Sequence, residues 1–329
     1  MDVLYLSSAD VADLAAPEDY VDVVREGYRD RGNGAPAEPR TLLPSPGDPG
    51  MFTTYTAILP ELGYMGGYMY AAGFSGKDAW FVTPLFDAET GELCAMLDGA
   101  SMNPAKTGAA GAVGIDALAR SDAMTLGVIG SGTQARGQVR AGATVRDFDE
   151  ILVYSPTRAH RESFATDLDS TLTATVTSVD DTESLVPHVD VLITATTASE
   201  PVFDGTLLEP GTHVTAMGQY DPNRRELDAQ TIAAARYVPD LRDRAFCDAG
   251  SFLHAVNTGA IAEDHIHAEL GEVVAGEQPG RTTDAQITVF DSGGTAIETV
   301  AAAGMLYERA RDQQRGTVLD LSPASEAFS

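Results

Sequence analysis

The chain has 329 residues, more than one hydrophobic core usually serves, so its length favours two domains. Its formal net charge of −28, from 49 acidic and 21 basic side chains, disfavours nucleic acid and anionic membranes as partners. No apolar run approaches the roughly 18 residues of a membrane span, and the N-terminus lacks a signal-peptide pattern. Two cysteines are too few for a disulfide framework, which fits a reducing cytoplasm.

The acidic residues are scattered along the chain rather than collected in one tail. This distribution is typical of a folded protein with an acidic surface. Molar salt favours such a surface, because the Debye length there is only about 3 Å and self-repulsion is screened. We therefore expect a halophilic cytoplasmic protein.

The first third of the chain predicts a mixed α+β region. Its expected elements are a strand at residues 4–6, a helix from 17 to 29, strands at 52–59, 79–86 and 92–97, and a helix at 104–119. Asn103 is suited to cap the last helix. That helix is rich in glycine and alanine, which indicates that another backbone approaches it closely.

After Ser121 the pattern changes to alternating short apolar strands and helices. The expected strands are 126–129, 151–154, 189–194, 213–217 and 287–290, and the expected helices are 134–145, 159–168, 228–235 and 296–311. The fold class is therefore α/β, with a Rossmann-type doubly wound parallel sheet inserted in an α+β domain. We place the Rossmann domain at residues 121–304 and the other domain at 1–120 plus 305–329.

A glycine turn follows the first strand of the predicted Rossmann domain. Gly130 permits the tight turn, Gly132 lets the backbone approach a pyrophosphate, and Ala135 keeps the following helix close to the sheet. The helix N-terminus offers N–H donors and positive potential to phosphate. The predicted pyrophosphate-binding residues are Gly130, Ser131, Gly132, Thr133, Gln134 and Ala135. The alternative is a structural turn in another α/β fold.

The end of the second Rossmann strand predicts the cofactor. NAD sites usually carry an acidic residue there, whereas this chain has Ser155, Thr157 and Arg158, which could bind a 2′-phosphate. We expect NADP(H) rather than NAD(H); alternatively, Arg158 is a solvated residue at a helix start. Thr194, Ala195 and Thr196 should end a strand near the nicotinamide.

Several segments, in order from about residue 40 to 311, resemble the ornithine cyclodeaminase/μ-crystallin family. They are Pro39-Arg40, residues 86–91, 106–110, 127–135, 211–214, 225–228, 270–273 and 290–293. The resemblance implies a homodimer whose first domain binds a small amino- or imino-acid substrate and pairs with its twin. It also implies that Arg40 binds the substrate carboxylate, together with the residue at position 106.

Three positions depart from the family pattern. Met69 stands where the resemblance implies a catalytic lysine, and Lys106 replaces the second carboxylate-binding arginine, keeping the charge but losing the bidentate fork. Tyr220 occupies the position of an acidic residue, with Asp221 one residue on. We assign Arg40, Met69 and Lys106 to substrate binding, and Lys106, Tyr220 and Asp221 to catalysis.

These departures favour an NAD(P)H-dependent oxidoreductase of a small α-imino or α-amino acid, such as a ketimine or pyrroline-carboxylate reductase or an alanine dehydrogenase. Reduction of a preformed imine needs less acid/base chemistry than cyclodeamination. The proton donor could be Tyr68, Tyr70, Tyr220 or a displaced Lys77, although buried tyrosines are commonly packing residues. The alternatives are ornithine cyclodeaminase itself, an ammonia-lyase, and a non-catalytic NADPH-dependent binding protein like μ-crystallin. We expect no metal, because His213, His254, His265 and His267 lack a ligand framework.

Overall fold

The computed structural model describes residues 2–46, 49–75 and 78–327. The chain divides into two compact units, Met1–Lys106 with Thr295–Ser329, and Thr107–Gly294. The domain boundaries predicted from the sequence, after residues 120 and 304, differ from these limits. The first lies just beyond the helix that ends at Leu118 and the second lies within the helix Ala296–Asp312. They stay a prediction. No described helix is long and apolar enough to cross a membrane.

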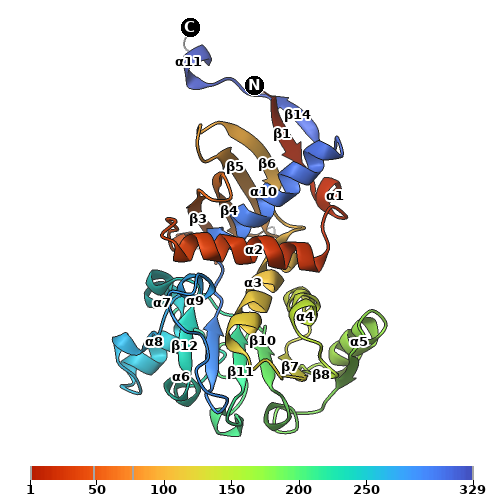
Figure 1. Cartoon of the computed structure of the whole chain (residues 1–329), viewed down its shortest axis with the longest axis vertical. Coiled ribbons are helices and arrows are strands. Elements are labelled where there is room, and N and C mark those ends of the chain that lie inside the picture. Colours follow the sequence, from red (N-terminus) through yellow and green to blue (C-terminus); the bar gives the residue numbers. More distant parts are fainter. Residues whose placement is uncertain (1, 47–48, 76–77, 328–329) are drawn as a thin grey trace. The chain divides into compact units, whose positions relative to one another are not determined.

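The first unit is a mixed sheet with helices on one face (Figure 1). Its elements are β1 (Asp2–Leu6), α1 (Ser8–Val11), α2 (Pro17–Gly32), β2 (Thr41–Pro44), β3 (Met51–Leu59), β4 (Tyr64–Ala72), β5 (Trp80–Asp87), β6 (Leu93–Asp98), α10 (Ala296–Asp312), β14 (Thr317–Asp320) and α11 (Ala324–Ala327). The strand order is β14-β1-β6-β5-β4-β3-β2, antiparallel except for the parallel pair β1 and β6.

Helix α10 packs on α2 and on the strands β3 and β4. An added Cβ at Gly27 of α2 would lie 3.1 Å from the Cβ of Ala301, so the two helices approach closely. The strands bury alternate residues against these helices, and the buried side chains of β3 are Thr53, Tyr55, Ala57 and Leu59. The core of this unit therefore lies on one face of the sheet.

The second unit contains an all-parallel sheet of order β12-β13-β11-β10-β7-β8-β9. Its strands are β7 (Thr125–Ile129), β8 (Glu150–Tyr154), β9 (Thr175–Ser178), β10 (Val191–Thr194), β11 (His213–Ala216), β12 (Arg236–Pro239) and β13 (Thr288–Asp291). Its helices are α4 (Thr133–Val145), α5 (Arg158–Asp169), α6 (Ala229–Ala234), α7 (Arg242–Asp248), α8 (Gly250–Asn257) and α9 (Leu270–Val274). The predicted Rossmann-type fold is confirmed.

Helix α3 (Asn103–Leu118) begins in the first unit and continues into the second. Asn103, expected as its cap, is its first residue. The close backbone approach predicted from its glycines is confirmed, because a Cβ at Gly108 would lie 2.4 Å from the carbonyl oxygen of Gly137 in α4. Only glycine permits this packing of α3 on α4.

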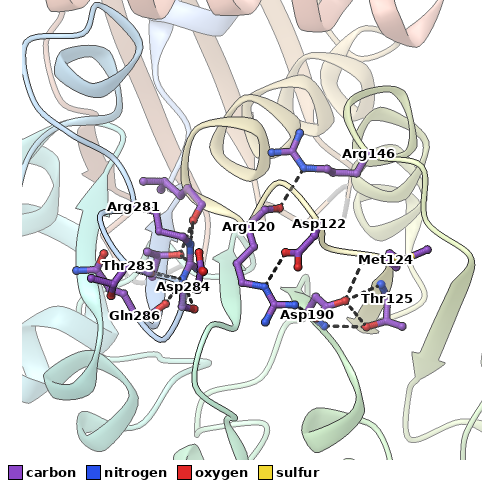
Figure 2. A network of polar contacts seen from close by, with 12 residues as sticks. Arg120, Asp122, Met124, Thr125, Arg146, Asp190, Arg281, Thr283, Asp284 and Gln286 are labelled. Carbon is purple, nitrogen blue, oxygen red and sulfur yellow. Dashed lines mark hydrogen bonds and ion pairs between the residues drawn. The ribbon is translucent and has the colours of Figure 1, made fainter.

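A polar network holds the amino ends of the parallel strands (Figure 2). The carboxylate of Asp190, just before β10, accepts hydrogen bonds from the amides of Met124 and Thr125 and pairs with Arg120 at 2.9 Å. Arg281 donates to the carbonyl of Leu118 at the end of α3, with an Nε–O distance of 2.9 Å. These contacts hold together the amino-terminal ends of the strands, at the end of the sheet opposite the glycine turn.

Candidate functional site

The turn after β7 has the geometry that dinucleotide binding requires. Gly130 has a φ of +119°, which favours glycine, and a Cβ there would lie 2.3 Å from the carbonyl oxygen of Ala195. Its amide donates to the carbonyl of Tyr154, with an N–O distance of 2.8 Å. The turn thus joins the carboxyl ends of β7 and β8 and the residue after β10, where open α/β sheets bind their ligands.

Gly132 leaves open space in front of the N-terminus of α4. It is the N-cap of that helix, and a Cβ at Gly132 would meet no atom within 4 Å. The first helical residues, Thr133 and Gln134, follow directly, and their amides belong to the four that an α-helix leaves without an internal acceptor. The buried Ala135 keeps the helix against the sheet. Residues 130–135 therefore fit a pyrophosphate.

The predicted 2′-phosphate residues lie at the end of β8. The hydroxyl of Ser131 donates to that of Ser155, with an O–O distance of 3.0 Å, and Thr157 is the N-cap of α5. The guanidinium of Arg158 is exposed and pairs with Glu162 at 2.7 Å. The sequence analysis missed Arg161, which is buried and donates to the carbonyl of Ser155 at 3.0 Å. Arg161 is therefore a second cation at this site, and it stabilises the loop that follows β8.

The end of β10 is held by a buried carboxylate that the sequence analysis also missed. Glu226 accepts hydrogen bonds from the amide of Thr196 at 2.7 Å and the hydroxyl of Thr194 at 3.0 Å. It also accepts from the amide of Gly218, after β11, at 2.8 Å. Burial raises the pKa of Glu226, and these hydrogen bonds act in the opposite direction. Glu226 thus fixes the loops expected near the nicotinamide.

In the first unit, aromatic and charged side chains gather on the helix-covered face of the sheet. The guanidinium of Arg40 lies 5.4 Å from the ring centroid of Tyr55, and the ammonium of Lys106 lies 4.8 Å from that of Tyr68. The rings of Tyr55 and Tyr68 are 5.5 Å apart. The structure therefore brings together Arg40 and Lys106, the two predicted carboxylate ligands, and we call these four residues with Glu298 the cation cluster.

Lys106 is buried, with 1% of its surface exposed, and its Nζ lies 3.7 Å from Oε1 of Glu298. Burial lowers the pKa of Lys106, the charge of Arg40 lowers it further, and Glu298 acts in the opposite direction. The sequence analysis missed Glu298, although Thr295-x-x-Glu298 is the capping-box pattern that opens α10. Two cations that repel one another in a buried setting suit an anionic ligand.

Two hydroxyls on this face of the sheet lack partners. Thr53 Oγ1 and Thr83 Oγ1 are buried and have no hydrogen bond to any described residue. Buried hydroxyls are usually satisfied, by protein or by a ligand or water. Their positions, on β3 and β5 at either side of β4, flank the strand that carries Tyr68.

Met69 is a correction. Its neighbours Tyr68 and Tyr70 point to the buried face of β4, so Met69 points to the opposite face, where it is 41% exposed. It lies there beside Thr54, with which it pairs across the strands. The side chain that meets Lys106 is Tyr68, whose hydroxyl donates to the carbonyl of Gly99 at 3.1 Å. The assignment of Met69 to substrate binding is therefore wrong.

Tyr220 and Asp221 lie in the loop after β11, in the second unit. The carboxylate of Asp221 closes a local turn by accepting from the amide of Asn223, with an O–N distance of 2.9 Å. Tyr220 is 38% exposed. Their catalytic role stays a prediction, and Lys77, the displaced acid considered above, lies outside the described residues.

The four histidines considered above as metal ligands lie within hydrogen-bonding distance of protein groups. His213 is buried, and its ring nitrogens lie 2.9 Å from Thr288 Oγ1 and 3.0 Å from Thr215 Oγ1. His265 bonds to the carbonyl of Ile232 and His267 to that of Pro279, both at 2.8 Å. Among the described residues, no group of three potential ligands is placed to hold a metal ion.

Known proteins resemble the chain over almost its whole length. The model of the ornithine cyclodeaminase/mu-crystallin family matches residues 3–314. A Δ1-pyrroline-2-carboxylate reductase of Bacillus cereus is 34% identical over 240 residues, 73% of this chain and 74% of the relative. The Δ1-pyrroline-2-carboxylate reductase of Thermococcus litoralis, solved with NADH and L-proline, has a TM-score of 0.90 at 30% identity and covers 96% of this chain and 99% of its own. An archaeal alanine dehydrogenase dimer with bound NAD gives 0.91 at 30% identity, covering 98% and 100%.

Proposed function

Because the chain belongs to the ornithine cyclodeaminase/mu-crystallin family, we propose that it is an NAD(P)H-dependent reductase of a small α-imino acid. The observation that carries this proposal is the turn at residues 130–135, with its open side at Gly132 and the N-terminus of α4 behind it. Bound NAD(P)H supplies a hydride to the carbon of a C=N bond. The relatives named above act on pyrroline-2-carboxylate or alanine, which supports this substrate class.

The cation cluster is the proposed substrate site. Arg40 can bind a carboxylate through two parallel N–H donors, whereas Lys106 offers a compact charge with three rotatable donors. An anion between them relieves the repulsion that acts on the buried Lys106. Binding through the carboxylate leaves the C=N group as the part of the substrate that reacts.

We assign NADP(H) as the preferred cofactor. Ser155, Thr157 and Arg158 place two hydroxyls and a guanidinium at the end of β8, and no carboxylate stands at position 155 to repel a 2′-phosphate. The ion-pair partner of Arg158, Glu162, is itself exposed, so Arg158 can turn to a phosphate at small cost. The named structures contain NADH or NAD, so this preference is a point on which the chain would differ from them.

We also propose that the protein is a homodimer. The face of the mixed sheet that α2 and α10 leave uncovered carries apolar side chains, among them Phe52, Ile58, Met69, Val82 and Trp80, the last 77% exposed. A hollow of about 540 Å³, lined by Met65, Met69 and Phe86 among others, lies there. Exposed apolar patches of this kind mark protein interfaces, and the archaeal alanine dehydrogenase is a dimer. The free thiols of Cys94 and Cys247 support a cytoplasmic location.

Steady-state assays in molar KCl test the function. We expect NADPH to be consumed with Δ1-pyrroline-2-carboxylate, or with pyruvate plus ammonia. Formation of proline from ornithine with a catalytic amount of cofactor would instead identify the lyase. NADPH binding without turnover on any imino acid would identify a binding protein.

A further inference from the structure

We propose that Lys106 donates the proton that the substrate nitrogen gains on reduction, and that Glu298 is the positioning residue that holds the Lys106 ammonium for this step. The inference rests on the proposed imine reduction and deepens it. It gives Lys106 a chemical role in addition to carboxylate binding, and it gives a role to Glu298, which no sequence motif of the site had suggested.

Among the members of the cation cluster, Lys106 has the chemistry that proton donation needs. Arg40 stays protonated at any pH that a protein tolerates, so it binds but does not transfer a proton. The hydroxyl of Tyr68 already donates to Gly99, and burial raises its pKa, as it does that of Tyr55. Lysine, by contrast, changes its protonation readily when buried, which is why buried lysines serve as acids and bases.

Glu298 is placed to hold the ammonium and is itself fixed. Its Oε1 accepts from the amide of Thr295 at 2.7 Å and its Oε2 from the hydroxyl of Thr295 at 2.6 Å. The same Oε1 lies 3.7 Å from Nζ of Lys106, and both side chains are 1% exposed. The capping box therefore does two things: it begins α10, and it points a locked carboxylate at the ammonium.

The face of Tyr68 lies on another side of the ammonium, with its ring centroid 4.8 Å from Nζ. Lys106 thus has an aromatic face, a fixed carboxylate and the positive charge of Arg40 around it. Two titratable groups outside the cluster act on its tyrosines: Tyr70 on β4 raises the pKa of both Tyr55 and Tyr68, and Asp98 on β6 raises that of Tyr68. Glu298 is the carboxylate beside the ammonium, with its Oε1 3.7 Å from Nζ, and the proposal makes the imine nitrogen of a bound substrate the acceptor of its proton.

In an α-imino acid the nitrogen and a carboxylate oxygen are close enough for one ammonium to bond both. Transfer of a proton from Nζ to the imine nitrogen leaves Lys106 as a neutral amine and makes the C=N carbon a better hydride acceptor. Hydride addition to that carbon converts the C=N double bond to C–N, oxidises NAD(P)H to NAD(P)⁺ and completes the amino acid. Lys106 then regains a proton from water.

The pH dependence has a defined sign. Donation requires the protonated form, so kcat for imine reduction should fall as the pH rises through the pKa of Lys106. Burial and Arg40 lower the pKa of that group, and Glu298 counteracts them. Removing the charge of Glu298 should therefore move the alkaline limb of the kcat profile to lower pH.

The first test compares Lys106→Arg with the wild type. Arginine can hold the carboxylate but cannot release a proton, so we expect KM to change only a few-fold while kcat falls by roughly 10² to 10⁴. Calorimetry with NADP⁺ and pyrrole-2-carboxylate, a planar analogue that cannot be reduced, gives a readout without turnover. In buffers of different ionisation enthalpy, the wild type should take up protons on binding at alkaline pH, and Lys106→Arg should bind without that uptake.

The second test is Glu298→Gln, with Glu308→Gln as a matched control on the same helix. Glu308 bonds to Tyr64, outside the cation cluster. We expect the alkaline limb to move to lower pH in Glu298→Gln only. If Lys106→Arg fails to bind the analogue, the position of the alkaline limb in Glu298→Gln still tests whether Lys106 is the proton donor.

A wild-type kcat retained within threefold in Lys106→Arg, or an unmoved alkaline limb in Glu298→Gln, would overturn the assignment and leave imine reduction intact. Failure of the wild type itself to reduce any imino acid would overturn the proposed function instead.

Discussion

The hydroxyl of Ser131 donates to the hydroxyl of Ser155 across the carboxyl ends of β7 and β8, with an O–O distance of 3.0 Å. The bond connects the turn that would hold the pyrophosphate with the residue that would select the 2′ group of the adenosine ribose. Ser155 is only 5% exposed, and its carbonyl accepts from the buried Arg161. The two loops proposed to control pyrophosphate binding and cofactor choice are therefore hydrogen-bonded to each other.

Ser155→Asp should reverse the cofactor preference. A carboxylate at the end of β8 repels a 2′-phosphate and accepts hydrogen bonds from ribose hydroxyls. We expect the dissociation constant for NADPH to rise roughly tenfold to a hundredfold, the range of a lost charge-assisted hydrogen bond, while that for NADH changes less. Fluorescence titration with both nucleotides measures this. Ser163→Asp, which adds the same charge on the exposed side of α5, is the control, and an equal loss for both nucleotides would refute the assignment.

Alanine at Gly130 should lower the stability of the protein, whereas alanine at Gly132 should weaken cofactor binding. A Cβ at Gly130 meets the Ala195 carbonyl at 2.3 Å, in a left-handed backbone conformation, so Gly130→Ala should lower the melting temperature. A Cβ at Gly132 meets no protein atom within 4 Å, so Gly132→Ala should melt like the wild type. It should nevertheless bind NADPH at least tenfold more weakly, because the methyl group occupies the path of the pyrophosphate. Unchanged affinity in Gly132→Ala would mean that the phosphates bind elsewhere.

Much of the fold can be predicted because its strongest patterns are local. Buried parallel strands appear as short apolar runs, and the turn at Gly130 marks where the first one ends. Five strands are absent from the prediction. Four of them, β2, β9, β12 and β14, have four residues each, which is too short to show a period. The fifth is β4, nine residues long, whose glycine pair and exposed Met69 break the apolar pattern. The order of the strands depends on contacts between residues far apart in the sequence. Local periodicity gives no information about these contacts, so the strand order could not be predicted from it.

The candidate site is less predictable, because its key contacts depend on strand register. Whether Tyr68 or Met69 faces Lys106 is decided by a one-residue alternation along β4, and the two choices look alike in the sequence. Glu226 and Glu298 are buried carboxylates whose partners come from other segments or from a helix cap. Of the two, only Glu298 has a local signal, its spacing from Thr295.

Low salt should destabilise the protein. The formal net charge of −28 is spread over the chain, and the Debye length shrinks from about 30 Å at 0.01 M salt to about 3 Å at 1 M. We therefore expect the melting temperature to rise steadily with KCl over this range, and to rise equally with NaCl at equal ionic strength. An uncharged osmolyte at matched osmolality is the control for excluded-solute effects. A melting temperature that is flat or falling in KCl would argue against adaptation to salt.

His213 should make the free energy of unfolding depend on pH. Burial, with smaller contributions from Arg281 and Arg146, lowers its pKa from 6.5 to about 3. Between these two values the unfolded chain binds a proton that the folded chain does not. The stability contributed by neutral His213 is therefore complete above pH 6.5 and is lost as the pH falls, by up to about 1.4 kcal/mol per unit.

His213→Gln isolates this effect from the many carboxylates, which titrate mainly at lower pH. Urea unfolding of wild type and variant between pH 7.5 and 5 should show a gap in the free energy of unfolding that narrows as the pH falls, because glutamine does not titrate. The gap at pH 7.5 measures the lost hydrogen bonds to Thr288 and Thr215, whereas its slope measures the histidine. His160→Gln, at an exposed position on α5, is the matched control substitution. A constant gap for His213→Gln would mean that this imidazole takes up a proton in the folded protein as easily as in the unfolded chain, so that its burial among threonines carries no penalty for charge.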